Sequence, residues 1–169
     1  MSGAQHIVVM GVSGAGKTTT GLALAAHLGW PFVEGDAFHP QSNVEKMAHG
    51  TPLTDADREP WLRALADQIA AAEARGESSV LGCSSLKRAY RDILRTGAPR
   101  VRFLHVHGTR ALLEDRLNHR AGHFFPPKLL DSQLATLEPL AADEDGVVID
   151  MALSAEDQVA EALRLLGLD

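Results

Sequence analysis

Residues 6–18 read HIVVM-GVSGAGKT, and this stretch decides the fold. Its first part, residues 6–10, is an apolar run typical of a strand buried on both faces of a sheet. Residues 11–18 then match the pattern G-x-x-x-x-G-K-[ST] in full. Residues 17–28 predict a helix that stops at Gly29. A strand, a glycine-rich loop and a helix in this order predict a phosphate-binding loop and make a chance glycine-rich turn a poor alternative.

The residue types of this loop suit a nucleoside triphosphate with its Mg²⁺ ion. Glycines allow the backbone to wrap closely, so that successive N–H groups face phosphate oxygens, and the helix adds its positive N-terminal end. Lys17 is expected to reach the β- and γ-phosphates, and the Thr18 hydroxyl to bind Mg²⁺. The predicted ATP-binding residues of the loop are Gly11, Val12, Ser13, Gly14, Ala15, Gly16, Lys17, Thr18 and Thr19.

The rest of the chain alternates short apolar runs with longer helical patterns. Strands are predicted at 6–10, 31–33, 79–83, 101–106 and 146–150, and helices at 17–28, 59–75, 87–95, 109–118, 127–137 and from 154 onward. Pro60 is expected in the first turn of its helix, and residues 39–57 are expected to be mostly loop around one short helix. This order predicts an α/β fold, a five-stranded parallel sheet with helices on both faces, in a single domain over residues 1–169.

Composition excludes several classes of protein. The chain has 169 residues and a net charge of −6, which argues against a non-specific nucleic-acid binder. Its one cysteine excludes a disulfide framework and, with no basic-then-apolar leader, favours the reducing cytoplasm. No apolar run approaches the length of a membrane span. The negative charge is uneven, since residues 87–128 hold ten Lys or Arg against three Asp or Glu, a net charge of +7.

Polar residues near the ends of the second and third strands are candidates for the acceptor site. Asp36 follows the second strand, at the edge where α/β sheets bind ligands, and could orient an acceptor hydroxyl, take its proton or hold Mg²⁺ through water. A loop-capping role is the alternative for Asp36. Ser84 follows the third strand, and Asp57 and Arg58 precede the long helix.

A lid is predicted at about residues 119–127, where glycine and prolines interrupt the helical pattern. Arg116 and Arg120 lie beside the loop at residues 122–125 within it, and arginines on a mobile lid can neutralise charge on a transferring phosphoryl group. For the four basic residues of the helix at 87–95, a solvated helix face is as good an interpretation.

Two other interpretations carry less weight. His105 and His107 share a strand face, but without further ligands at a recognisable spacing zinc is not expected. Cys83 is interpreted as a small buried apolar residue, and Trp61 as part of the core. The Asn-Lys-x-Asp signature of guanine-binding GTPases is absent.

The chain resembles the small, shikimate-kinase-like P-loop gluconokinases. The resemblance is carried by GDAFHP at 35–40, DADREPWL at 55–62, CSSLK at 83–87 and GHF at 122–124, and is continued by residues 43–47, 90–92, 130–133 and 137–139. The phosphate-binding loop is general to P-loop proteins, whereas this set is much more specific and covers nearly the whole chain in order.

The resemblance implies a commonly dimeric, ATP-dependent enzyme that phosphorylates D-gluconate at its 6-hydroxyl. Catalytic roles are expected for Lys17, Asp36 and Arg120, with Arg116 against the adenine. The expected substrate-binding residues are Asp36, His39, Lys46, Arg58, Ser84, Lys87, Arg91 and His123. The cations in that set, Lys46, Arg58, Lys87 and Arg91, are the candidates for the gluconate carboxylate. A kinase for another small acceptor, such as shikimate, a nucleoside or another sugar acid, and a non-catalytic ATP-sensing module remain alternatives.

Overall fold

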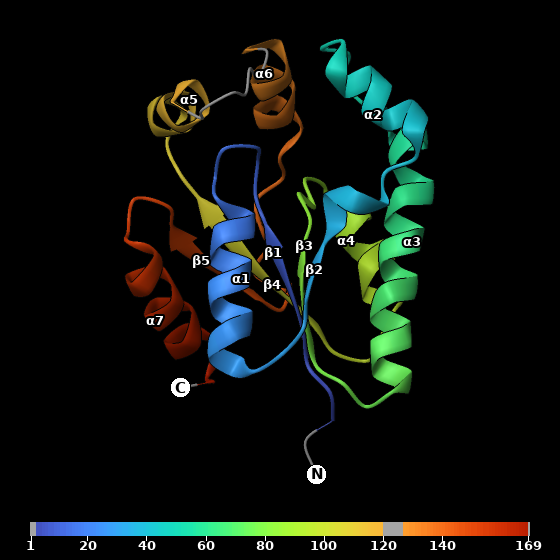
Figure 1. Ribbon diagram of the computed structural model, residues 1–169, viewed down its shortest axis with the longest axis vertical. Helices are drawn as coiled ribbons and strands as arrows, with labels where there is room; N and C mark the ends of the chain where they lie inside the picture. The colour runs from blue at the N-terminus through green and yellow to red at the C-terminus, as the bar shows by residue number, and fades with distance from the viewer. Residues whose placement is uncertain (1–2, 120–126, 169) are drawn as a thin grey trace.

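The computed structural model describes residues 3–119 and 127–168 (Figure 1). These residues form one five-stranded sheet in the order β2-β3-β1-β4-β5, in which every neighbouring pair is parallel. The strands are β1 (His6–Met10), β2 (Phe32–Glu34), β3 (Ser79–Gly82), β4 (Val101–His107) and β5 (Gly146–Asp150). The predicted α/β fold with a five-stranded parallel sheet is therefore confirmed.

Helices cover both faces of the sheet. In Figure 1, α1 (Lys17–Leu28) and α7 (Ala155–Leu166) lie together on one side, while α3 (Asp55–Ala74) and α4 (Arg88–Arg95) lie on the other. β1 occupies the centre, and all five of its residues are buried. Its burial on both faces accounts for the nearly unbroken apolar run that opens the sequence.

The carboxyl ends of the strands lie at one edge, opposite the N-terminus. There, α2 (Gln41–Ala48), α5 (Arg110–Asn118) and α6 (Pro127–Thr136) stand above the sheet (Figure 1). The register aligns Val9 with Gly82 and Met10 with His105, so the loops that follow β1, β3 and β4 emerge together. Parallel sheets bind ligands at this edge.

Most predicted element boundaries lie within one residue of the observed ones, and the start of α3 is the main correction. α3 begins at Asp55 rather than Glu59, because the Thr54 side chain accepts from the Asp57 N–H and the Asp57 carboxylate accepts from the Thr54 N–H. This capping box places Pro60 in the second turn and not in the first. The second strand lies one residue later than predicted and ends at Glu34.

The predicted lid falls outside the described residues except for its two ends, His119 and Pro127. Within the described part of the chain, no helix is both long and apolar enough to cross a membrane.

Candidate active site

The phosphate-binding loop joins the central strand to α1. Gly11, Gly14 and Gly16 have positive φ values of 150°, 89° and 88°, which L-residues with a side chain rarely adopt. A Cβ atom on Gly14 would lie 2.8 Å from the Leu117 Cγ of α5, and one on Gly11 would lie 2.8 Å from the Val106 carbonyl oxygen. The glycines of the motif are therefore required both for the turn and for its close fit against β4 and α5.

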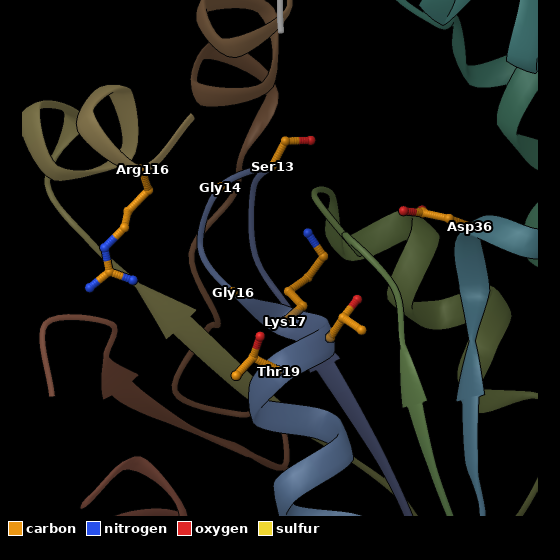
Figure 2. Close-up of a pocket in the computed structure, with 8 residues that line it drawn as sticks. Ser13, Gly14, Gly16, Lys17, Thr19, Asp36 and Arg116 are labelled. Atoms are coloured by element: carbon orange, nitrogen blue, oxygen red, sulfur yellow. The ribbon is translucent and has the colours of Figure 1, made fainter. Parts of the chain in front are cut away.

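A cavity of about 270 Å³ opens over this loop. It is lined by Ser13, Gly14, Gly16, Lys17, Thr18, Thr19, Asp36 and Arg116. Figure 2 shows the Lys17 side chain rising between the loop and Asp36, with Arg116 descending from α5 on the other side of the loop. The Lys17 Nζ donates to the Val12 carbonyl oxygen at 3.1 Å. The cavity thus combines glycine backbone, a lysine and an arginine, which suits a polyphosphate.

Oxygen ligands for a magnesium ion gather at the mouth of this cavity. The Thr18 hydroxyl donates to the Glu34 carboxylate, and the Asp36 N–H faces the same carboxylate. Gly35 makes the turn between the two acids possible, because a Cβ there would lie 2.1 Å from the Gly82 carbonyl oxygen. Hydroxyl and carboxylate oxygens suit Mg²⁺, which usually keeps several waters and phosphate oxygens as its other ligands.

Across the described residues, this site included, no three or more His, Cys, Asp or Glu side chains are grouped so as to hold a metal ion. His105 is buried, and its burial, followed by the nearby His107, lowers its pKa to about 4. The Cys83 thiol is buried too, and that burial raises its pKa to about 11.

A second cavity, of about 370 Å³, adjoins the first and shares Ser13, Lys17 and Asp36 with it. Its polar lining comes from the segments that follow β2 and β3, from the phosphate-binding loop and the start of α1, and from α3 and α6. Its apolar lining comes from α2, α3, α6 and the loops beside them. The remaining lining residues are His39, Val44, Met47, Pro52, Leu53, Arg58, Trp61, Ser84, Leu86, Leu129, Ser132 and Gln133. A compact polar molecule in this cavity would reach Lys17 and Asp36 beside the phosphate site.

Arg58 brings a buried positive charge to this second cavity. Only 8% of the residue is exposed, and its Nη1 donates to the Tyr90 hydroxyl at 2.8 Å. Among residues 3–119 and 127–168, no carboxylate forms an ion pair with its guanidinium. A buried charge without a direct ion pair is costly, and Asp55 acts on Arg58 only across the Tyr90 hydroxyl, so an anionic ligand would add a direct partner for the guanidinium.

His39 and Trp61 form the wall next to Asp36. Their rings are stacked with centroids 4.0 Å apart, and the Trp61 Nε1 donates to the Gly35 carbonyl oxygen at 2.8 Å. Burial lowers the pKa of His39, and Arg58 acts in the same direction against the opposing effect of Asp36. The Asn43 amide nitrogen contacts the His39 Nδ1 at 3.2 Å. A neutral His39 that accepts at Nδ1 carries its proton on Nε2.

Comparison with known proteins identifies the family. A family model described as "AAA domain" matches residues 7–140. A gluconokinase of Gluconobacter oxydans is 50% identical over 159 residues, which cover 94% of this chain and 89% of that protein. The chain belongs to the gluconokinase family.

Two solved structures, a gluconokinase and a sugar kinase, extend this result. A gluconokinase from Sinorhizobium meliloti is 46% identical with a TM-score of 0.89, covering 99% of this chain and 94% of the other. A sugar kinase from Janibacter, solved without ligand, is 48% identical with a TM-score of 0.93, covering 98% and 95%. The resemblance to gluconokinases is therefore confirmed along nearly the whole chain.

In this member of the gluconokinase family, the structure brings half of the predicted acceptor residues together. Asp36, His39, Arg58 and Ser84 line the second cavity. Arg120 and His123 lie outside the described residues. The predicted loop residues join the first cavity or, like Val12 and Ala15, are buried in the loop behind it.

Three of the cations predicted to bind the gluconate carboxylate form ion pairs with carboxylates of the protein and do not line the second cavity. The Lys46 ammonium pairs with Asp57 at 2.8 Å, and the Lys87 ammonium pairs with Asp55 at 3.0 Å. Arg91 is a correction: its guanidinium is fully buried and donates to both oxygens of Glu144, at 2.7 and 2.8 Å. With its charge neutralised inside the protein, Arg91 is a structural residue.

Sequence reasoning missed Glu34, Gln133 and the second role of Trp61. Gln133 accepts from the Ser13 N–H at 2.7 Å and donates to the Ser13 hydroxyl at 3.0 Å, which ties α6 to the phosphate-binding loop. The family motif at residues 130–133 includes this glutamine, but the sequence analysis assigned no role to it. Trp61 is core, as predicted, but it also lines the second cavity.

Proposed function

We propose that this chain transfers the γ-phosphoryl group of ATP to the 6-hydroxyl of D-gluconate, giving 6-phospho-D-gluconate and ADP. One observation carries the proposal: the cavity over the phosphate-binding loop and a second cavity, lined by a buried arginine that makes no ion pair among the described residues, share Lys17 and Asp36. The names of the similar proteins agree with this geometry.

ATP binds with its phosphates over residues 11–18. The loop N–H groups and the N-terminus of α1 bind the phosphate oxygens, and Lys17 reaches the γ-phosphate from inside the loop. Arg116 lines the same cavity and lies against the adenine as a cation over a ring. Arg120, from the predicted lid, adds positive charge beside the transferring group.

Magnesium would be held by Thr18, with Glu34 and Asp36 contributing through bound water. When bound, Mg²⁺ neutralises charge on the β- and γ-phosphates. The Thr18 hydroxyl is already oriented by its hydrogen bond to Glu34. The two carboxylates flank Gly35 and hold negative charge close to, but not inside, the phosphate loop.

Gluconate occupies the second cavity with its carboxylate on Arg58 and its 6-hydroxyl near Asp36. A guanidinium can donate two parallel N–H bonds to a carboxylate. The polar residues His39 and Ser84 are placed to bind the intervening hydroxyls. Apolar side chains around them exclude water from the transferring group.

Asp36 orients the attacking 6-hydroxyl and takes up its proton as the new O–P bond forms and the bond to ADP breaks. The transition state is loose, so the main requirements are position and charge neutralisation rather than a strong base. Lys17 and the cations beside the loop supply that neutralisation.

We base the proposed assembly on the resemblance to gluconokinases and the proposed cellular setting on the single cysteine of the chain. We propose a cytoplasmic homodimer that binds neither nucleic acid nor membrane, in keeping with the net charge of −6. Size-exclusion chromatography with light scattering tests the dimer directly.

A panel of acceptors tests the proposed reaction. ADP release would be measured with D-gluconate, shikimate, nucleosides and other sugar acids at saturating ATP·Mg²⁺. We expect gluconate-dependent turnover well above every other acceptor. Preferred turnover of a different acceptor would reassign the substrate, and ATP binding without turnover on any of them would indicate a non-catalytic module.

A further inference from the structure

A chain of four polar side chains lies behind the second cavity and ends on its arginine. The Lys87 ammonium donates to the Asp55 carboxylate at 3.0 Å, the Tyr90 hydroxyl donates to the same carboxylate, and Arg58 donates to the Tyr90 oxygen at 2.8 Å. Arg58 and Tyr90 are both buried, whereas Asp55 is exposed. The relay therefore runs from the surface to the cavity, joining α3 to the start of α4.

The direction of each hydrogen bond in this relay is fixed by chemistry. Hydrogen bonds from Tyr90 and then Lys87 lower the pKa of Asp55, so it is a carboxylate that can only accept. Burial, then the bond to Asp55, raises the pKa of Tyr90 and keeps its proton in place. The single phenolic proton points to Asp55, which leaves an oxygen lone pair for Arg58.

Tyr90 thereby separates a carboxylate from a buried guanidinium that would otherwise attract it. A direct Arg58–Asp55 pair would neutralise the arginine and occupy the donors that an incoming carboxylate needs. Arg58 instead meets a neutral oxygen, and its guanidinium carbon lies 5.3 Å from the Tyr90 ring centroid. Tyr90 therefore holds the Arg58 side chain in place, while the guanidinium still lines the second cavity and can bind an anion there.

We propose that Tyr90 is a positioning residue that sets the preference of the acceptor site for a sugar acid over a neutral polyol. Tyr90 holds Arg58 at the cavity and prevents a direct ion pair between Arg58 and Asp55. This inference rests on the proposed function, because it assumes that the acceptor is an acid bound through Arg58. Tyr90 is the only tyrosine in the chain.

The test compares wild type with Tyr90→Phe, which keeps the ring and removes the hydroxyl. Steady-state assays give KM for gluconate, KM for ATP and kcat, and D-glucitol, a neutral polyol of the same length, gives an inhibition constant. We expect KM for gluconate to rise about tenfold, the effect of losing one hydrogen bond to a charged group. The other three constants should stay within about twofold.

A second variant tests why KM rises. If Asp55 captures Arg58 when the hydroxyl is gone, Tyr90→Phe combined with Asp55→Asn should recover part of the lost affinity for gluconate. A melting curve of each variant confirms that it is folded, and a double variant no better than Tyr90→Phe would overturn the separation of charges.

Three kinetic outcomes contradict the inference. An unchanged KM for gluconate in Tyr90→Phe overturns it, and so does an equal rise in KM for ATP or for D-glucitol inhibition, which would indicate a general structural role. Wild type without any gluconate turnover contradicts the proposed function and this inference together, so the two failures are distinguishable.

Discussion

Two buried arginines on neighbouring helices, Arg58 on α3 and Arg91 on α4, have opposite electrostatic surroundings. Arg91 is fully buried and meets both oxygens of Glu144, and it also donates to the Ser85 and Glu138 carbonyl oxygens, at 2.9 and 3.1 Å. Arg58 meets a phenol, and no ion pair to it is found among the described residues. From the sequence alone, both were candidates to bind the gluconate carboxylate.

The role of a buried cation depends on which negative charge offsets its desolvation. Removing a charge from water costs several kcal/mol unless an opposite charge and hydrogen bonds offset that cost. For Arg91, the Glu144 carboxylate of the protein itself offsets that cost. Arg91 also donates to the Ser85 carbonyl oxygen, next to Ser84, which lines the second cavity. For Arg58 we infer that the offset arrives with the ligand.

The largest expected effect is on stability. Arg91→Met leaves the Glu144 carboxylate buried with only Arg95 beside it, so the free energy of unfolding should fall by about 3–5 kcal/mol. Denaturant unfolding measures this. Arg88→Met on the same helix removes an exposed pair with Asp143 and is the control, with an expected loss of about 0–1 kcal/mol. Equal losses in the two variants would remove the distinction between buried and exposed pairs.

Acid should weaken the same buried pair. Hydrogen bonding from Arg91, more than any other contact, lowers the pKa of Glu144 to about 2 from an ordinary value of 4.5. A carboxyl with a lowered pKa in the folded state stabilises it fully above pH 4.5, and that contribution disappears as the pH falls toward 2. It amounts to about 3 kcal/mol.

Unfolding free energies of wild type and Glu144→Gln from pH 6 to 3 test this contribution. The difference between the two proteins should shrink steadily below pH 4.5. A difference that is independent of pH would mean that the glutamate charge does not stabilise the fold.

The smallest expected effect is that of Arg58→Met on stability. Methionine fills much of the same volume without a charge to desolvate, and the lost hydrogen bond to Tyr90 offsets that gain. We expect the free energy of unfolding without ligand to change by less than about 1 kcal/mol. A loss as large as that of Arg91→Met would show that Arg58 is a second structural arginine.

The fold and the phosphate site were predictable because their signals are local. The apolar run of β1, the glycines at 11, 14 and 16, and Lys17 follow one another in the chain, and their backbone geometry follows from residue type. The start of α3 was missed although Thr54 and Asp57 form a capping box, because Pro60 suggested a later first turn.

The acceptor site was only partly predictable because it depends on contacts distant in sequence. Arg91 lies 53 residues from Glu144, and nothing near Arg91 in the chain indicates that its charge is already neutralised. Gln133 lies 120 residues from Ser13, so its contact with the phosphate-binding loop could not be predicted from neighbouring residues either. Charge alone identified four candidate cations, and packing decides among them.

Steady-state kinetics of Arg58→Met test whether Arg58 supplies the positive charge for the gluconate carboxylate. KM for gluconate should rise about 30-fold, or roughly 2 kcal/mol, as expected when a charge-assisted contact is lost. KM for ATP should stay within about twofold. Arg63→Met, an exposed arginine of the same helix paired with Glu59, is the control and should leave both constants unchanged. A KM for gluconate near the wild-type value, or equal rises for gluconate and ATP, would contradict the account.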